Sequence, residues 1–359
     1  MKNKLIFTLA PLLAAIFSHH AAADSAPPPA PVAATAKAAP AFSGKTIGKF
    51  AERVAALYAY DLDKDGTAEI IAGFDTGVAV FKLENGVLRK VARHDTGPRS
   101  QVTGVCAGDF SGEGEPEIFV NKIAGTAARG EILSFNGRSL DRVQDELKYF
   151  FICGANGKLY RQGQRTDGAL RDEVMAVEWT NQGMGERPFT PLPEQRRLSG
   201  LSIFDIDGDG AMDVAGFDMN RKLVYHSGAG DEWTNVDGEF GGSDITIRLT
   251  DEAEAEIHHE IQPAMVPMAS SGKFPLIVAP QNQYTFTLLS ATRNYVKSRI
   301  LAVENKGLGY EVTASTPVVD GVINAIVPFG KNSFIAARSQ KGLMGGTKSE
   351  ILLLTVEGF

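Results

Sequence analysis

The stretch DLDKDGTAEIIAGF, Asp61–Phe74, carries carboxylates at its first, third, fifth and ninth residues and ends in an apolar run. A closely related stretch, DIDGDGAMDVAGF, occupies Asp205–Phe217, and a degenerate copy, DFSGEGEPEI, starts at Asp109. The three starts are 48 and 96 residues apart, so a period near 48 places a copy without acids near Gly154. A repeat of this length is typical of propellers and other arrays.

Each copy consists of short runs with strand character. VAALYAY leads into the first acidic loop, AEIIAGF leads out, and VAVFKL and VLRKVAR follow around the turn Glu84-Asn85-Gly86. Apolar and β-branched runs joined by Asn-Gly turns indicate hairpins, and four strands per copy make a propeller blade. Faded copies at MVPMASSGKFPLIVAP and AIVPFGKNSFIAA bring the count to six. The sequence therefore predicts an all-β propeller of about six four-stranded blades, with seven left open.

The ring needs a strand from elsewhere in the chain to close. The last copy supplies VINAIVPF, SFIAARS and EILLLTV and then stops at Phe359, one strand short. The segment KTIGKF, Lys45–Phe50, precedes the first copy, where an outermost strand would run. We expect this segment to complete the last blade.

The N-terminus has the features of a secretory signal. Lys2 and Lys4 precede the apolar run Leu5–Phe17, and three alanines end at Ala23. We expect residues 1–23 to be removed and residues 24–41, rich in Ala and Pro, to form a linker. The propeller then spans residues 42–359. These features predict an exported protein, periplasmic or extracellular, with no membrane span.

Charge and cysteine content narrow the function further. Loss of the signal changes the formal net charge from -7 to -9, with 34 basic against 43 acidic residues. A mild acidic excess without a basic cluster argues against nucleic acid and anionic membranes as partners. Cys106 and Cys153 lie in separate apolar runs, which leaves open either a disulfide or two buried free thiols.

The acidic loops are suited to gathering oxygen atoms around one point. Hard cations such as Ca²⁺ take six to eight oxygen ligands at about 2.3 to 2.6 Å. Gly66 and Gly210 let the backbone turn sharply and bring the next carbonyl within reach. Carboxylates this close would repel one another without a cation. The predicted ligands are Asp61, Asp63, Asp65, Thr67 and Glu69 in the first loop, and Asp205, Asp207, Asp209, Ala211 and Asp213 in the second.

Two other kinds of structure could account for these loops. An EF-hand shares the opening D-x-D-x-D-G but requires a bidentate Glu at loop position twelve and a helix on each side. Position twelve is Ala72 in the first loop and Gly216 in the second, and the flanking runs are strand-like, so an EF-hand is excluded. Solvated acidic turns remain the alternative, because Asp and Gly are ordinary turn residues. Two full copies in register favour a metal.

The two stretches DLDKDGTAEIIAGF and DIDGDGAMDVAGF resemble the FG-GAP/VCBS repeat family, which has calcium loops in the β-hairpins of integrin-like propellers. The resemblance runs from about Ala51 to the C-terminus and weakens after Ser243. It implies that the acids at loop positions one, three, five and nine bind Ca²⁺. The middle copy departs from this pattern, so its candidate ligands are weaker: Asp109, Ser111, Glu113 and Glu117.

No motif in the sequence predicts catalysis. A G-x-S-x-G elbow, a Walker loop and a Rossmann fingerprint are all missing. His258 and His259 lack the second His at the spacing of a zinc protease helix, and neighbours on a strand point to opposite faces. We interpret the two histidines as a solvated pair in an acidic segment. We therefore expect no enzymatic activity.

Two classes of function remain for such a propeller. The first is a non-catalytic binding or assembly module of the cell envelope, with an envelope protein or a glycan as partner. The alternative is a carbohydrate-binding or carbohydrate-active protein, lectin-like or lyase-like, because propellers resembling this one also occur there. Fold alone does not choose between them, since function depends on sites that differ within one fold.

Overall fold

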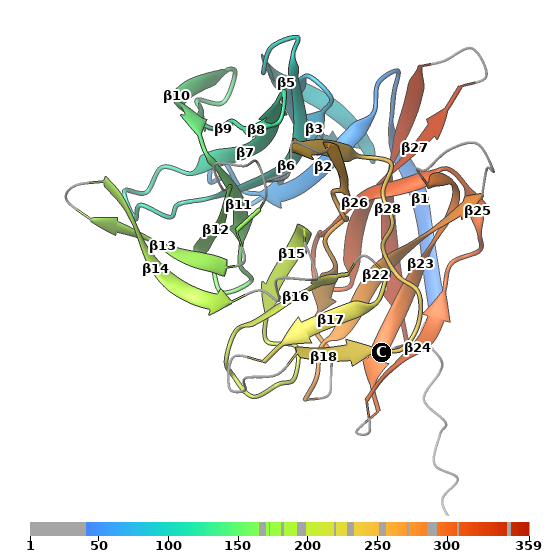
Figure 1. The fold of residues 1–359 in the computed structure, drawn as a ribbon. Coiled ribbons are helices and arrows are strands. Elements are labelled where there is room, and N and C mark those ends of the chain that lie inside the picture. Colours follow the sequence, from blue (N-terminus) through green and yellow to red (C-terminus); the bar gives the residue numbers. More distant parts are fainter. Residues whose placement is uncertain are drawn as a thin grey trace, which may run out of the picture. The chain divides into compact units, whose positions relative to one another are not determined.

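The computed structural model describes residues 41–358 except 165–169, 172, 181–182, 192–198, 219, 228–232, 251–255, 271–272, 286–292, 307–308 and 343–345. Strands and turns make up the described part of the chain, and no helix in it has the length and apolarity to cross a membrane. The strands form six sheets of four or five strands and one separate hairpin (Figure 1). The fold is a six-bladed β-propeller, which confirms the all-β prediction and decides between six and seven blades.

Consecutive stretches of chain build the first five blades, as the repeat predicted. Blade 1 contains β2 (Val54–Tyr60), β3 (Glu69–Phe74), β4 (Gly77–Glu84) and β5 (Val87–Asp95). Blade 2 contains β6 (Ser100–Gly108), β7 (Glu117–Ala124), β9 (Gly130–Phe135) and β10 (Leu140–Leu147), with the short β8 (Ala127–Ala128) paired to β7. Blade 3 contains β11 (Tyr149–Cys153), β12 (Leu159–Gly163), β13 (Glu173–Thr180) and β14 (Gly183–Pro191).

The later blades follow the same order. Blade 4 contains β15 (Ser199–Phe204), β16 (Asp213–Phe217), β17 (Leu223–His226) and β18 (Trp233–Val236). Blade 5 contains β21 (Val266–Met268), β22 (Leu276–Thr285), β23 (Asn294–Asn305) and β24 (Tyr310–Ser315), with β25 (Val319–Asp320) paired to β23. Blade 6 contains β26 (Val322–Pro328), β27 (Ser333–Lys341), β28 (Thr347–Glu357) and, from the other end of the chain, β1 (Ala41–Phe50).

Strand β1 closes the ring. It pairs antiparallel with β28, from Ala41 opposite Glu357 to Phe50 opposite Ser349 (Figure 1). The side chain of Ile47 is 2% exposed and packs in the core between blades 6 and 1. The prediction that the N-terminal segment completes the last blade is confirmed.

The hydrophobic core lies between blades because the central strands are apolar on both faces. In β3, Ile70 packs toward blade 6, whereas the next residue, Ile71, packs toward blade 2. Successive side chains of a strand point to opposite faces, so one apolar run serves two interfaces. Buried clusters occupy all six contacts between neighbouring blades. Each blade therefore depends on both neighbours for its burial.

Buried asparagines add directional bonds between blades. Asn282 of β22 accepts a hydrogen bond from Ile323 N (2.9 Å) and donates one to Ile323 O (2.9 Å) on the first strand of the next blade. Asn121 of β7 makes the same pair of bonds to the backbone of Phe151, at 2.6 and 2.8 Å. In both cases one side chain satisfies a backbone N–H and C=O that the sheets leave unpaired.

We expect Asn282→Ala to lower the free energy of unfolding by about 3 kcal/mol, because each buried polar group left without a partner costs roughly 1 to 3 kcal/mol. Chemical denaturation of the purified protein measures this. Asn332→Ala serves as the control, because Asn332 is an exposed loop residue. Equal stability of the two variants would contradict a structural role for the Asn282 bonds.

The hairpin between blades 4 and 5 was not predicted as a separate element. It consists of β19 (Thr246–Thr250) and β20 (Glu256–Glu260), and its two strands pair only with each other within the described residues. His259 lies on β20 and is 6% exposed. The interpretation of the two histidines as a solvated pair is therefore wrong for His259, whose side chain is buried. The side chain of His258 lies outside the described residues.

Candidate metal-binding loops

The loop between β2 and β3 folds around its own carboxylates. Asp61 Oδ2 accepts a hydrogen bond from Gly66 N at 2.9 Å, and Asp65 Oδ1 accepts one from Thr67 N at 2.8 Å. Gly66 has a φ of 88°, a conformation that glycine adopts without steric cost. Glu69 Oε2 accepts a bond from the N–H of Leu62, at 2.8 Å. These bonds aim the acidic side chains into the loop.

The loop between β15 and β16 has the same bonds at the same positions. Asp205 Oδ2 accepts from Gly210 N (3.0 Å), Asp209 Oδ1 accepts from Ala211 N (2.7 Å), and Asp213 Oδ2 accepts from the N–H of the second loop residue (2.7 Å). Gly210 has a φ of 90°. The two loops, 144 residues apart in the sequence, therefore share one backbone conformation.

Each of these loops brings three carboxylates together. Oxygen atoms of the acids at positions one, three and nine lie within 4.8 Å of one another in both loops. The ninth acid is fully buried in each case, with Glu69 and Asp213 both 0% exposed. In the described part of the chain, Asp61 Oδ1 is also buried and receives no hydrogen bond. Closely grouped carboxylate oxygens, with one acid of each group fully buried, fit a hard divalent cation such as Ca²⁺. The grouped acids are Asp61, Asp63 and Glu69, and Asp205, Asp207 and Asp213.

The remaining predicted ligands are placed differently. Asp65 and Asp209 accept hydrogen bonds from the backbone of their loops and do not belong to the groups of three. Thr67 and Ala211 are close by, since their N–H groups donate those bonds. Asp65 is exposed at the loop surface, so a metal could recruit this acid only by displacing the groups that hold its two oxygens.

The third acidic loop, between β6 and β7, is less well formed. Gly114 N donates to Asp109 Oδ2 at 2.9 Å, as in the other loops, but the bond from Glu113 N to Ser111 Oγ is long at 3.4 Å. Among the described residues, the acids of this loop do not form a group within the 4.8 Å limit. Burial, with the charges of Glu113 and Asp109, raises the pKa of Glu117. The loop thus keeps the backbone pattern without the tight cluster.

A lysine that the sequence analysis missed lies in the first loop. Lys82 Nζ on β4 is 2.7 Å from Asp63 Oδ2, 2.7 Å from Asp65 Oδ2 and 3.3 Å from Glu69 Oε1. Its hydrogen bond lowers the pKa of Asp65. The fourth-blade loop instead has Ser227, whose hydroxyl donates to Asp207 Oδ2 at 2.9 Å. The pairing register of β4 with β3 would have predicted that Lys82 lies next to these acids. A search of the sequence for acidic residues could not.

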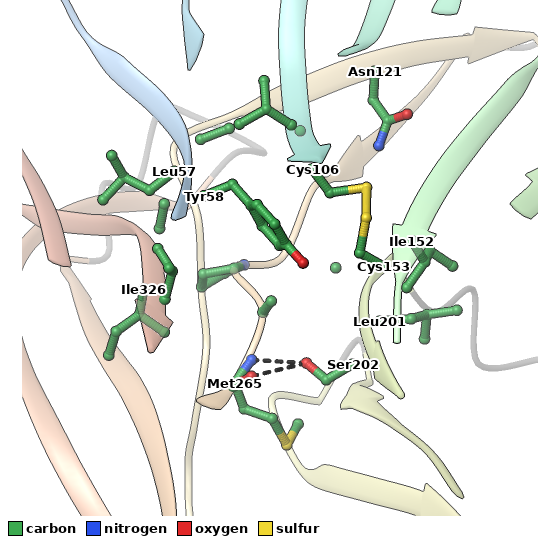
Figure 2. Close-up of a pocket in the computed structure, with 18 of the residues that line it drawn as sticks. Leu57, Tyr58, Cys106, Asn121, Ile152, Cys153, Leu201, Ser202, Met265 and Ile326 are labelled. Carbon is green, nitrogen blue, oxygen red and sulfur yellow. Dashed lines mark hydrogen bonds between the residues drawn. A yellow bond between two sulfur atoms is a disulfide. The ribbon is translucent and has the colours of Figure 1, made fainter. Parts of the chain in front are cut away.

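A central cavity of about 260 Å³ runs between the first strands of the blades (Figure 2). Its wall is largely apolar, with Leu57, Ile152 and Leu201 among the side chains that line it. The hydroxyl of Ser202 on the wall is bonded to the backbone of Met265, with its Oγ 3.0 Å from Met265 N and 3.1 Å from Met265 O. The bonds of Ser202 therefore hold blade 4 to the chain that leads into blade 5.

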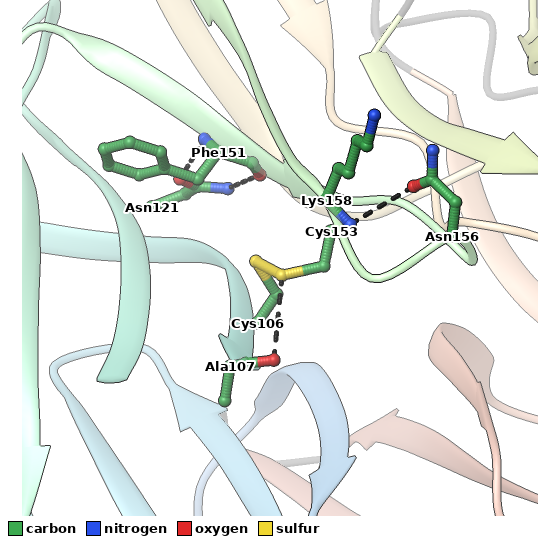
Figure 3. The surroundings of a disulfide bond; sticks show 7 residues. All are labelled: Cys106, Ala107, Asn121, Phe151, Cys153, Asn156 and Lys158. Carbon is green, nitrogen blue, oxygen red and sulfur yellow. Dashed lines mark hydrogen bonds between the residues drawn. A yellow bond between two sulfur atoms is a disulfide. The ribbon is translucent and has the colours of Figure 1, made fainter. Parts of the chain in front are cut away.

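The two cysteines form a disulfide on the wall of this cavity (Figures 2 and 3). Cys106 lies on β6 and Cys153 on β11, with their Cα atoms 5.9 Å apart. The bond links the first strands of blades 2 and 3, close to the Asn121 bonds to Phe151 (Figure 3). Of the two alternatives that the sequence left open, the structure contains the disulfide.

Comparison with known proteins identifies a repeat in the first part of the chain. Residues 41–120 match the family model described as FG-GAP-like repeat, so this segment carries such a repeat. The matched segment contains the Asp61 loop, Lys82 and the start of the middle copy. No protein of curated function matches the sequence.

Several solved structures are similar to this chain over most of its length. One is the PQQ-bound aldose sugar dehydrogenase of Streptomyces coelicolor, with 10% identity and a TM-score of 0.47 over 89% of this chain and 98% of that chain. A protein of unknown function from Dyadobacter fermentans has 10% identity and a TM-score of 0.48, over 88% and 99%. BBS1N, in complex with ARL6DN, has 9% identity and a TM-score of 0.44, over 87% and 96%.

Proposed function

We propose that this protein is an exported, calcium-binding β-propeller that serves as a non-catalytic binding or assembly module of the cell envelope. The observation that carries the proposal is the grouping of three carboxylates, one of them fully buried, in a loop conformation that occurs twice. The FG-GAP-like repeat at residues 41–120 supports the same conclusion. Export rests on the signal-like N-terminal sequence.

A bound Ca²⁺ would act on the scaffold. The acids that would hold it, such as Asp205 and Asp207, lie in a loop that joins the first two strands of a blade, next to the cavity wall. Charge neutralisation there would relieve the repulsion of a buried carboxylate with its neighbours. The ion would then stabilise the platform on which a partner binds, without taking part in any reaction.

We expect Ca²⁺ to raise the melting temperature of the mature protein. Because the folded loop gathers carboxylates that the unfolded chain disperses, the ion binds the folded state preferentially. At one hundred times the dissociation constant, one site contributes about 2.7 kcal/mol to the free energy of unfolding. Asp207→Asn combined with Asp209→Asn should remove this gain. Thermal melts with calcium and with a chelator measure the effect.

The control changes the same number of charges outside the loops. Asp237 and Asp320 are exposed, so Asp237→Asn combined with Asp320→Asn should keep the full response to calcium. A wild-type melting temperature that calcium does not change would mean that the loops are acidic turns without a metal.

The partner class is tested by affinity capture from envelope extracts with and without a chelator. We expect a specific envelope protein or glycan that is retained only in calcium. Strong binding to defined sugars on a glycan array, with no protein captured, would favour the carbohydrate-binding alternative. Turnover of glycoside, ester, phosphoester or peptide substrates would contradict the non-catalytic assignment.

A further inference from the structure

The residue that faces the ninth acid of a loop differs between the two well-formed loops. In blade 1, Ile70 pairs with Phe81, so the preceding Glu69 faces Lys82 across the sheet. The ammonium group of Lys82 then reaches into the loop and contacts three carboxylates at once. A positive charge from the protein itself therefore lies among the acids of the first loop.

The equivalent position in the other loops is a serine. In blade 4, Val214 pairs with His226, so Asp213 faces Ser227. In blade 2, Glu117 pairs directly with Ser134. A serine hydroxyl is neutral and short, so it brings no positive charge to the acids. The first loop thus differs from the other two at one structurally equivalent position on the third strand of the blade.

We propose that Lys82 is the built-in cation of the Asp61 loop, so that this loop folds without calcium, whereas the Asp205 loop, with Ser227 at the same position, binds the ion. The inference rests on the proposed calcium-binding function and specifies which of the two loops carries it. One side chain on the third strand decides whether a loop of this protein needs metal.

The geometry explains why lysine and calcium exclude each other. An ammonium group has three donors, and Lys82 donates hydrogen bonds to Asp63 and Asp65, both at 2.7 Å, while its Nζ also lies 3.3 Å from Glu69 Oε1. A calcium ion would need oxygens of the same acids at about 2.3 to 2.6 Å, which leaves no room for the ammonium. Binding would first have to displace Lys82 and break its charge-assisted hydrogen bonds. The apparent affinity of this loop for calcium is reduced accordingly.

The consequence is a propeller with two kinds of acidic loop. Blade 1, which contacts the closing blade 6, has a loop whose negative charge is partly compensated by Lys82 at any calcium concentration. Blade 4, on another part of the ring, has a loop that responds to the ion. Changes in calcium would then act on blade 4 while leaving the closure of the ring unaffected.

Exchange of the two side chains tests the proposal. The binding stoichiometry of the full chain for CaCl₂ is measured by titration calorimetry, after circular dichroism has shown that each variant is folded. Lys82→Ser, which copies the fourth-blade loop, should bind one equivalent more than the wild type. Ser227→Lys, which copies the first-blade loop, should bind one equivalent fewer. Lys90→Ser removes an exposed lysine of β5 and should leave the stoichiometry unchanged.

The outcomes separate this inference from the function on which it rests. If the wild type binds calcium but Lys82→Ser adds no equivalent, the inference is wrong and the calcium-binding function stands. If the wild type binds none and Lys82→Ser binds one, the role of Lys82 is supported and calcium binding by the natural protein is contradicted. If none of the proteins binds calcium, both are wrong. Because the test compares the stoichiometry of each variant with that of the wild type, an ion bound in the Asp109 loop would not affect the result.

Discussion

Deletion of residues 41–50 is expected to lower the free energy of unfolding by at least about 5 kcal/mol and to cause aggregation. Strand β1 buries Ile47 in the core between blades 6 and 1, and Phe50 contacts the rings of Phe74 and Phe81, each at 5.4 Å. Each large apolar side chain removed from such a core costs about 1.5 to 3 kcal/mol. The deletion also exposes the edge of β28 along its length. An unprotected apolar edge is a template for pairing between chains.

A deletion in the preceding segment provides the control. Removal of residues 25–39, which lie outside the described part of the chain, should leave the melting temperature and the oligomeric state unchanged. Thermal melts and size-exclusion chromatography distinguish the two deletions. If both variants behave alike, the N-terminal strand does not close the ring.

The sequence predicted the blade repeat because its signals are local. The acids of each loop lie within nine residues of one another, and the Asn-Gly turns occur at the hairpins they form. Asn85 and Gly86 have φ values of 52° and 79°, as a tight hairpin turn requires. The closing strand followed from counting, since a ring of four-stranded blades cannot end one strand short. The order of these signals along the sequence was therefore sufficient to predict the blades and the closing strand.

The features that were missed depend on contacts between strands. The pairing of β3 with β4 brings the ammonium group of Lys82 to the acids of the Asp61 loop. No motif within the loop itself predicts this contact. His259 is buried on the inserted hairpin, whereas its acidic sequence context suggested an exposed side chain. In both cases the residues next to the side chain in the sequence do not reveal its environment in the fold.

The disulfide could have been predicted from the sequence, because the spacing of its two cysteines matches the period of the repeat. Cys106 and Cys153 are 47 residues apart, almost one repeat. Residues one repeat apart occupy equivalent positions in neighbouring blades, and the first strands of neighbouring blades approach one another around the central cavity. Two cysteines on those strands are therefore close in space. The period of the repeat would have favoured the bond over two free thiols.

Loss of this disulfide is expected to lower the free energy of unfolding by about 4 kcal/mol, from the loop-closure entropy of a cross-link with a separation of 47 residues. Cys106→Ala combined with Cys153→Ala removes the bond with little change in volume. Either single variant should be destabilised nearly as much as the double variant, because one missing sulfur already breaks the bond and the two effects are not additive. Chemical denaturation of the three variants measures this.

Wild-type protein refolded under reducing conditions should match the double variant. Alkylation of both thiols in denatured, unreduced wild type would show that the cysteines are not joined, and two single variants with additive effects would show that packing, not the cross-link, is the source of the stability.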